Sequence, residues 1–545
     1  MYVFKHSWGL HLLIVLLLLN QSVGALPTPR HTDKNSQKQL KNVLFFAVDD
    51  LRPELGTYGI DFVKSPNIDK LASESMVFER AYTQIAVCSP SRASLLTGRR
   101  PDSNHVWRIA GDEYWRPITN ATTIPQYFKE NGYVSAGMGK IFHPGQPSGN
   151  DDRAYSWSLP YFHAPGDSAN HSSWHSFDTE DSNLRDGKIA ANAISTLKEI
   201  KQNRSKGDNT PFFLAVGFHK PHLPFYCAKE FYDMYPPAEQ IELPKNPDVP
   251  KDFPPVARAL VEIYSYADIK PFYPDLQKCF TDVQASFYGK GCRIPDDYTR
   301  VLRRAYYSCV SYTDAQIGKV IREMESLGFA NDTIIVLWAD HGWQLGEHNH
   351  WCKHTNFEDA ARVPFILRVP GVTDRGMRTK ALVELIDIFP TLTELAGLDT
   401  PPMCPEGDDK PLVCIEGTSV TPLLSNPDQQ WKKAAFSQYP RPAQGMTQIP
   451  NEPIYSSDEH DENVMGYSIR VDQYRFTEWY RFNRTTATPN FTDIWGTELY
   501  DHTSPTVFFN DENVNLAGQA EMKNLVLQLR QTLQAGWRAA LPPSP

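Results

Sequence analysis

Four nearly continuous apolar segments constrain the fold of this chain more than any other feature. A strand without alternation of apolar and polar residues is typical of a parallel sheet that is covered on both faces. Helical periodicity at 66–81, 124–131 and 298–327 supplies covering helices. The pattern therefore predicts an α/β fold, with strands at 42–48, 133–138, 211–218 and 333–339.

Acidic and basic side chains follow each of the four predicted strands. In open parallel sheets, ligands bind outside the carboxyl ends of the strands. A polar residue after one strand is ordinary in a solvated loop, but four such strand ends at one edge are typical of an enzyme. The residues concerned are Asp49, Asp50, Lys140, His143, His219, His222, Asp340 and His341.

Three of these side chains are carboxylates that could share one cation. Asp49, Asp50 and Asp340 offer the hard oxygen ligands that Ca²⁺ or Mg²⁺ prefers. Without a cation, clustered carboxylates repel one another. The alternative for an Asp-Asp pair is a turn or a helix cap without a metal.

The segment CSPSRASLLTG predicts a short helix that begins at a cysteine. Pro90 suits the first turn, Ser89 or Ser91 can cap free amide groups, and Gly98 ends the helix. Cys88 then lies in the positive field of the helix N-terminus, which predicts a lowered thiol pKa. A buried cysteine with a purely structural role is the alternative.

The same segment resembles the signature of the type I sulfatases, C-x-P-S-R followed by Thr-Gly. Gly-Lys-x-x-His at 139–143 and Pro-His-x-Pro at 221–224 are also similar to motifs of this family. The resemblance extends from residue 42 to the C-terminus, with interruptions at 145–190, 226–300 and 443–460.

The resemblance implies the fold of alkaline phosphatase and the sulfatases. That fold has a large mixed, mainly parallel sheet between helices, and a smaller C-terminal domain with an antiparallel sheet and a closing helix. We expect the catalytic domain at 42–430 and the C-terminal domain at 431–545. Within the latter, strands are expected at 465–470, 474–479 and 497–500, and a helix at 520–539.

The family also implies a catalytic aldehyde. In type I sulfatases a formylglycine-generating enzyme oxidises the motif cysteine to Cα-formylglycine, and the hydrated aldehyde, a gem-diol, attacks sulfur. By resemblance, one Ca²⁺ is bound by Asp49, Asp50, Asp340, His341 and the residue derived from Cys88, although imidazole is an unusual ligand for so hard a cation. The implied catalytic residues are Cys88, Arg92, Lys140, His143, His222 and Lys353.

For the substrate, the resemblance implies a sulfated glycosaminoglycan oligosaccharide. The expected activity is that of a lysosomal exo-sulfatase that removes the 2-O-sulfate of terminal iduronate in heparan sulfate and dermatan sulfate. Lys353, Trp343 and Arg470 are the expected substrate-binding residues. Trp343 would form an apolar wall for the sugar ring, and Arg470 would pair with the uronate carboxylate. Core packing of Trp343 and a surface ion pair of Arg470 are the structural alternatives.

Three other functions remain open at this point. A sulfatase with a different sugar specificity would use the same motifs. A phosphohydrolase of the alkaline-phosphatase superfamily usually has a Ser or Thr nucleophile and two metal ions, so Cys88 argues against it. A secreted glycan-binding protein would keep an unconverted cysteine, which the complete set of acids and bases disfavours.

The N-terminal residues predict entry into the secretory pathway. Residues 1–25 contain a basic residue, an apolar run and then small residues, as in a signal peptide, and the polar residues 26–41 are expected to be disordered. N-glycosylation is predicted at the sequons of Asn120, Asn170, Asn203, Asn331, Asn483 and Asn490.

Cysteine content and charge agree with such a protein. Cys404 and Cys414 bracket a short loop and Cys279 and Cys292 a longer one, so both pairs are plausible disulfides. The net charge of −10 argues against nucleic acid or an anionic membrane as a partner. No segment after residue 25 is apolar over the length of a membrane span. Cys227, Cys309 and Cys352 remain unassigned.

Overall fold

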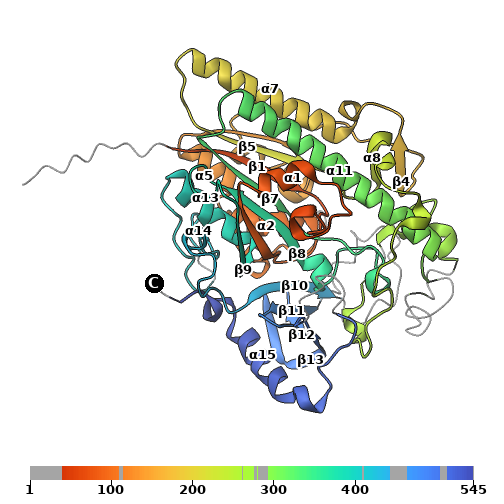
Figure 1. The fold of residues 1–545 in the computed structure, drawn as a ribbon. Helices are drawn as coiled ribbons and strands as arrows, with labels where there is room; N and C mark the ends of the chain where they lie inside the picture. The colour runs from red at the N-terminus through yellow and green to blue at the C-terminus, as the bar shows by residue number, and fades with distance from the viewer. Residues whose placement is uncertain are drawn as a thin grey trace, which may run out of the picture. The chain divides into compact units, whose positions relative to one another are not determined.

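A seven-stranded sheet forms the core of the computed structural model (Figure 1). The structure describes residues 40–543 except for 110–113, 260–261, 275–278, 280–291, 408–409, 442–462 and 504–511. The predicted signal peptide at 1–25, and residues 26–39 of the segment expected to be disordered, lie outside the described residues. Residues from Leu40 onward group as one unit, and the domain boundary near residue 430 stays a prediction.

Six of the seven strands share one direction. Only β8 runs antiparallel to its neighbours β7 and β2. Every residue of β1, β5 and β7 is buried, which explains why these strands lack polar alternation. The predicted mixed, mainly parallel sheet is confirmed. In sheet order the strands are β3 (Val134–Gly139), β5 (Phe212–Phe218), β1 (Asn42–Val48), β7 (Thr333–Ala339), β8 (Arg362–Arg368), β2 (Met76–Tyr82) and β9 (Met377–Glu384).

Helices cover both faces of this sheet (Figure 1). One face carries α1 (Pro66–Ala72), α7 (Arg185–Ser205) and α11 (Asp296–Ser326), and the other carries α2 (Cys88–Thr97), α5 (Ile124–Glu130) and α13 (Ile388–Ala396). The shorter elements are α3 (Pro101–Asn104), α4 (Arg116–Thr119), α6 (Arg153–Ser156), β4 (Trp174–Phe177), β6 (Phe225–Ala228), α8 (Lys229–Asp233), α12 (Glu358–Ala361) and α14 (Thr421–Ser425).

The helix predicted over 66–81 is wrong in its second half. The helix α1 ends at Ala72, and residues from Met76 onward form β2 between β8 and β9. Met76, Val77 and Phe78 are buried in that position. Pairing on both sides therefore overrides the helical spacing of the apolar residues, which tertiary context commonly does.

A second, antiparallel sheet of four strands follows toward the C-terminus. Helix α15 (Lys523–Ala535) buries Val526, Leu529 and Leu533 in the core of this sheet. The predicted C-terminal sheet and closing helix are confirmed. The strands are β10 (Ala435–Arg441), β11 (Val464–Arg470), β12 (Tyr474–Asn483) and β13 (Thr488–Asp501).

Two disulfides join cysteines that are close in sequence, Cys279 to Cys292 and Cys404 to Cys414. Disulfides of this kind suggest a protein of the secretory pathway. Cys88, Cys227, Cys309 and Cys352 are buried and not disulfide-bonded. All six sequon asparagines are exposed. Among the described helices, none has the length and apolar character needed to cross a membrane.

A buried ion-pair network connects the end of β9 to the segment that precedes β10. The carboxylate of Glu384 accepts two 2.8 Å hydrogen bonds from Arg100 and one of 2.6 Å from Lys432, which also contacts Asp387. Burial alone would raise the pKa of Glu384, but Arg100 and Lys432 outweigh it and hold that pKa at about 2.

Replacing Glu384 tests this network through the pH dependence of stability. Because the folded-state pKa lies below the ordinary value of 4.5, the stabilisation is complete above pH 4.5 and is lost as the pH falls toward 2. We expect Glu384→Gln to lower the free energy of unfolding by about 3–5 kcal/mol above pH 4.5, with a smaller difference at lower pH. Urea unfolding over this range measures it. Exposed Glu521→Gln is the control, and a pH-independent difference would contradict the prediction.

Two glycines allow β3 and β5 to approach closely where β3 ends. Gly139 has φ +72°, and a Cβ atom at Gly217 would lie 2.3 Å from the carbonyl carbon and oxygen of Lys140. This contact places the Lys140 backbone against β5, so a side chain at residue 217 would displace it.

Gly217→Ala is therefore expected to destabilise the protein by about 1–3 kcal/mol through overpacking. Gly518→Ala is the control, because nothing lies within 4 Å of a Cβ atom at that position. Denaturant unfolding of both variants measures the effect, and equal stabilities would refute the proposed close packing.

Candidate active site

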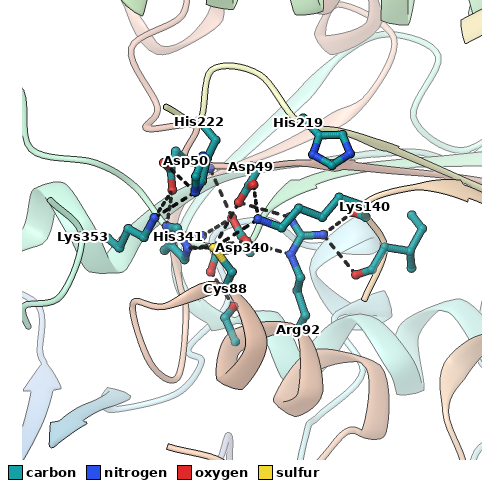
Figure 2. A network of polar contacts seen from close by, with 12 residues as sticks. Asp49, Asp50, Cys88, Arg92, Lys140, His219, His222, Asp340, His341 and Lys353 are labelled. Carbon is teal, nitrogen blue, oxygen red and sulfur yellow. Dashed lines mark hydrogen bonds and ion pairs between the residues drawn. The ribbon is translucent and has the colours of Figure 1, made fainter. Parts of the chain in front are cut away.

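The carboxyl ends of five strands meet at one edge of the large sheet, and the predicted residues gather there (Figure 2). Asp49 and Asp50 follow β1, Lys140 follows β3, His219 and His222 follow β5, and Asp340 and His341 follow β7. The unpredicted strand β2 leads to Cys88 at the start of α2. Sequence-distant side chains come together because parallel strands end at the same edge.

Cys88 lies at the centre of this cluster. Its Sγ is 3.4 Å from Asp49 Oδ1, 3.4 Å from Lys140 Nζ and 3.3 Å from His341 Nε2. Helix α2 begins at Cys88 and ends before Gly98 in the left-handed conformation, as predicted. The predicted serine cap is wrong: α2 has no side-chain cap, and Ser91 Oγ donates to the Asp340 carbonyl instead.

The expectation of a lowered thiol pKa at Cys88 is also wrong. Burial, reinforced by the negative charge of Asp49, raises the pKa of this thiol to about 12, although Lys140 and Lys353 act in the opposite direction. The side chain is almost completely enclosed, so desolvation outweighs the field of the helix N-terminus. The unmodified thiol is therefore protonated.

Cations donate hydrogen bonds to two of the three carboxylates. Arg92 Nε donates to Asp340 Oδ2 at 2.8 Å, and Lys140 Nζ donates to Asp49 Oδ2. The carboxylate oxygens of Asp50 accept no hydrogen bond from the described residues, although Lys353 Nζ lies 3.3 Å and His341 Nδ1 3.2 Å from Oδ1. Asp50 thus presents buried oxygens whose hydrogen-bonding capacity is unused.

The electrostatic environment shifts the pKa values of the adjacent acids Asp49 and Asp50 in opposite directions. Burial raises the pKa of Asp50 well above its usual value, and the Asp49 charge adds to this effect. Burial acts in the same direction on Asp49, but Lys140, His222 and Arg92 outweigh it and lower its pKa. A cation beside Asp50 would favour its ionised form.

The cluster fits a divalent metal ion. Ligand atoms of Asp49, Cys88, Asp340 and His341 all lie within 4.8 Å of one another, and the same holds for a second set that includes Asp50 and His222. Buried oxygens without hydrogen bonds, together with several carboxylates, are what a hard cation requires.

Lys353 and His222 form the opposite side of the site. Lys353 Nζ lies 3.2 Å from His222 Nε2 and 5.1 Å from the ring centroid of Trp343. His222 Nδ1 contacts the Leu223 carbonyl at 2.5 Å, so Nδ1 carries the proton and Nε2 accepts one.

His143 lies close enough to the site that the charges of Lys140, Asp49 and Arg92 affect its pKa. Nδ1 lies 3.1 Å from the Pro144 carbonyl. Burial and the neighbouring charge of Lys140 lower the pKa of His143 to about 3, so the ring is neutral.

Arg92 donates to the Lys140 and Ile141 carbonyls and is thereby fixed in position.

Besides Lys353, two residues were predicted to bind the substrate, and they occupy different surroundings. Arg470 on β11 directs Nε to Glu358, 3.2 Å away, and contacts the Asp472 carbonyl. Trp343 is completely buried, and its carbonyl accepts from Arg52. Trp343 borders the site through Lys353, whereas Arg470 does not line the cavity beside it. Their roles in sugar binding stay predictions.

A cavity of about 230 Å³ opens beside this cluster. Asp49, Lys140 and His222 line it together with residues that had no assigned role in the sequence-based site. The strand-end pattern indicated His219. Leu223 and Pro224 belong to the Pro-His-x-Pro motif, and Lys220 directly precedes that motif. Asp167, Arg185 and Tyr226 lie outside the motifs quoted above. The additional lining residues are Pro144, Asp167, Arg185, His219, Lys220, Leu223, Pro224 and Tyr226.

Sequence comparison relates this chain to known sulfatases. The Sulfatase family model matches residues 41–398, and the model "N-sulphoglucosamine sulphohydrolase, C-terminal" matches residues 346–538. Iduronate 2-sulfatase of Mus musculus is 40% identical over 522 residues, which cover 86% of this chain and 89% of the relative.

Solved structures share the fold. Phosphonate monoester hydrolase SpPMH from Silicibacter pomeroyi superposes with a TM-score of 0.64 at 21% identity, covering 92% of this chain and 96% of its own. A protein solved in complex with its substrate, D-glucosamine-2-N,6-O-disulfate, has a TM-score of 0.63 at 21% identity, covering 92% and 99%. The chain belongs to the sulfatase family and is a sulfuric ester hydrolase similar to iduronate 2-sulfatase.

Proposed function

We propose that this protein is a lysosomal exo-sulfatase that removes the 2-O-sulfate of terminal iduronate in heparan sulfate and dermatan sulfate. The observation that carries the proposal is the placement of Cys88, in the sulfatase signature, within contact of Asp49, Lys140 and His341 beside a cavity. The 40% identity with iduronate 2-sulfatase supports the choice of sugar.

Two groups complete the site in this proposal. Formylglycine derived from Cys88 by the formylglycine-generating enzyme supplies a hydrated aldehyde as the nucleophile toward sulfur. Asp49, Asp50, Asp340, His341 and the residue derived from Cys88 would hold Ca²⁺, which would neutralise charge on the sulfate oxygens. The buried oxygens of Asp50 support the presence of a cation.

Arg92 and Lys140 stabilise the negative charge of the sulfate group. Arg92 is completely buried and is held by Asp340 and two backbone carbonyls, so its position requires no rearrangement during the reaction. Lys140 Nζ lies 3.4 Å from Cys88 Sγ, the position of the nucleophile. Fixed cations at a site without free water stabilise developing charge most effectively.

Lys353 and His143 transfer protons in this proposal. Lys353 Nζ, which is hydrogen-bonded to His222 Nε2, supplies the proton that the departing sugar oxygen takes up. His143 is neutral and has its Nδ1 on the Pro144 carbonyl, so Nε2 accepts the proton that is released when the aldehyde is regenerated.

Mass spectrometry of the peptide containing residue 88 tests the proposal first. In protein secreted from a eukaryotic host, we expect the mass of this peptide to show that an aldehyde has replaced the CH₂–SH side chain of Cys88. We also expect this protein to hydrolyse 2-O-sulfated iduronate disaccharides. Cys88→Ala should abolish hydrolysis, whereas Cys352→Ala, outside the signature, should leave residue 88 convertible.

Two outcomes would contradict the proposal in different ways. An unconverted thiol, in a host that converts other sulfatases, would favour a glycan-binding protein without activity. A converted residue 88 with activity only toward other sulfated sugars, such as 6-O-sulfated glucosamine, would retain the sulfatase chemistry and overturn the substrate.

Calcium binding is testable without an activity assay. A ligand that binds only the folded state stabilises it by about 2.7 kcal/mol at a concentration 100 times its Kd. We therefore expect Ca²⁺ to raise the Tm of chelator-treated protein, and Asp50→Asn to abolish most of that rise. The exposed Asp233→Asn serves as the control. A Ca²⁺ response that is equal in both variants would exclude Asp50 as a ligand.

A further inference from the structure

One part of the cavity lining carries a guanidinium group that the mechanism does not use. Arg185 is the first residue of α7 and lines the cavity together with Asp49, Lys140 and His222. Its guanidinium contacts His219 Nδ1 at 3.3 Å and the Pro165 carbonyl at 3.5 Å. Among the described residues, no carboxylate forms an ion pair with it. A cation that lines a cavity without a carboxylate partner is suited to an anionic ligand.

The segment 165–167 holds Arg185 in place from the opposite side. The backbone N–H of Arg185 donates to the Asp167 carboxylate at 3.1 Å. A Cβ atom at Gly166 would lie 2.0 Å from the guanidinium NH2 nitrogen, so a larger residue at this position would require the guanidinium to move from the place it occupies. The guanidinium is therefore directed by its surroundings, and less conformational freedom is lost when it binds a ligand.

His219 extends this positively polarised surface. Burial and the adjacent charge of Arg185 keep the pKa of His219 well below its usual value, so the ring is neutral. Because Arg185 donates to Nδ1, the proton of the neutral ring is on Nε2, which is a donor. Figure 2 places the imidazole beside Lys140 and Asp49, near the sulfate-binding residues.

The other cations of the lining are already neutralised or bonded. Lys140 pairs with Asp49, and Lys220 Nζ donates to the His222 and Pro224 carbonyls at 2.8 and 2.7 Å. The cavity is also smaller than the clefts of about 300–1,000 Å³ that hold drug-sized ligands, so it is suited to a single sugar ring. A ring with its sulfate ester at residue 88 would extend into the part of the cavity that Arg185 lines.

We propose that Arg185, with His219 Nε2, binds the carboxylate of the uronic acid whose sulfate ester is hydrolysed at residue 88. Arg185 is thus a specificity-determining residue, and it takes the role expected for Arg470, whose guanidinium is engaged by Glu358. The inference rests on the proposed function, because it requires a uronate as the sulfated sugar.

The experiment combines two enzymes with two substrates. The substrates are a 2-O-sulfated iduronate glycoside and its carboxyl-reduced counterpart, and the enzymes are the parent protein and Arg185→Gln, both with residue 88 converted. Because Arg185→Gln removes a charge-assisted hydrogen bond to the uronate carboxylate, we expect it to lower kcat/KM for the uronate by about 10- to 100-fold, mainly by raising KM. The rate for the carboxyl-reduced substrate should change little.

Two further variants separate recognition from folding. Arg153→Gln removes another arginine with an exposed side chain outside the cavity lining, and should leave both substrates unaffected. Gly166→Ala keeps the charge but displaces the guanidinium, so it should reproduce the selective loss of uronate hydrolysis. Thermal unfolding identifies any variant that has lost its fold.

The outcomes distinguish this inference from the proposed function. Equal losses on both substrates, or uronate selectivity retained in Arg185→Gln, would overturn the role of Arg185 and leave the proposed function standing. A parent protein that hydrolyses a neutral aryl sulfate but neither glycoside would overturn the proposed function and the inference together.

Discussion

The structure depends on the compensation of charges that are buried at the carboxyl edge of one sheet. Asp49, Asp50 and Asp340 lie there without exposure to solvent, and an uncompensated buried carboxylate is costly. Arg92 and Lys140 donate hydrogen bonds to two of these acids, and Lys353 forms an ion pair with Asp50, whose oxygens accept no hydrogen bond from the described residues. The site therefore combines fixed cations with one buried acid whose oxygens remain available as ligands, which is an arrangement suited to a divalent ion.

The same burial explains the state of Cys88. A cysteine at a helix N-terminus is commonly an activated thiol, but here enclosure and the charge of Asp49 raise its pKa to about 12. Thiolate chemistry is thereby suppressed at the position where the sulfatase family places its aldehyde. In our proposal the surroundings serve the converted residue: Lys140 contacts the side-chain position directly, and Arg92 is immobilised by Asp340 and backbone carbonyls.

In our proposal, the cavity extends the charge arrangement from the sulfate group to the sugar. Asp49 and Lys140 line this cavity, and Arg185 and His219 contribute donors to it from the start of α7 and the end of β5. Both groups of residues lie against a glycine: the Lys140 backbone packs on Gly217, and the Arg185 guanidinium lies beside Gly166. Substrate selectivity and catalysis are thus assigned to different segments that converge on one cavity.

The sequence alone determined four adjacent strands of the large sheet (β3, β5, β1 and β7), the residues that follow them and three of the four strands of the C-terminal sheet, because buried strands and conspicuous motifs leave local patterns. It did not determine β2, whose apolar spacing is that of a helix and whose pairing with β8 and β9 is non-local. The sequence also did not determine the pKa of Cys88, because the desolvation of its thiol depends on residues that are distant in the sequence. Only the tertiary structure placed Arg470 against Glu358 and Arg185 in the cavity. A side chain that belongs to no sequence motif becomes part of a site only through neighbours that are distant in the sequence and that folding places beside it.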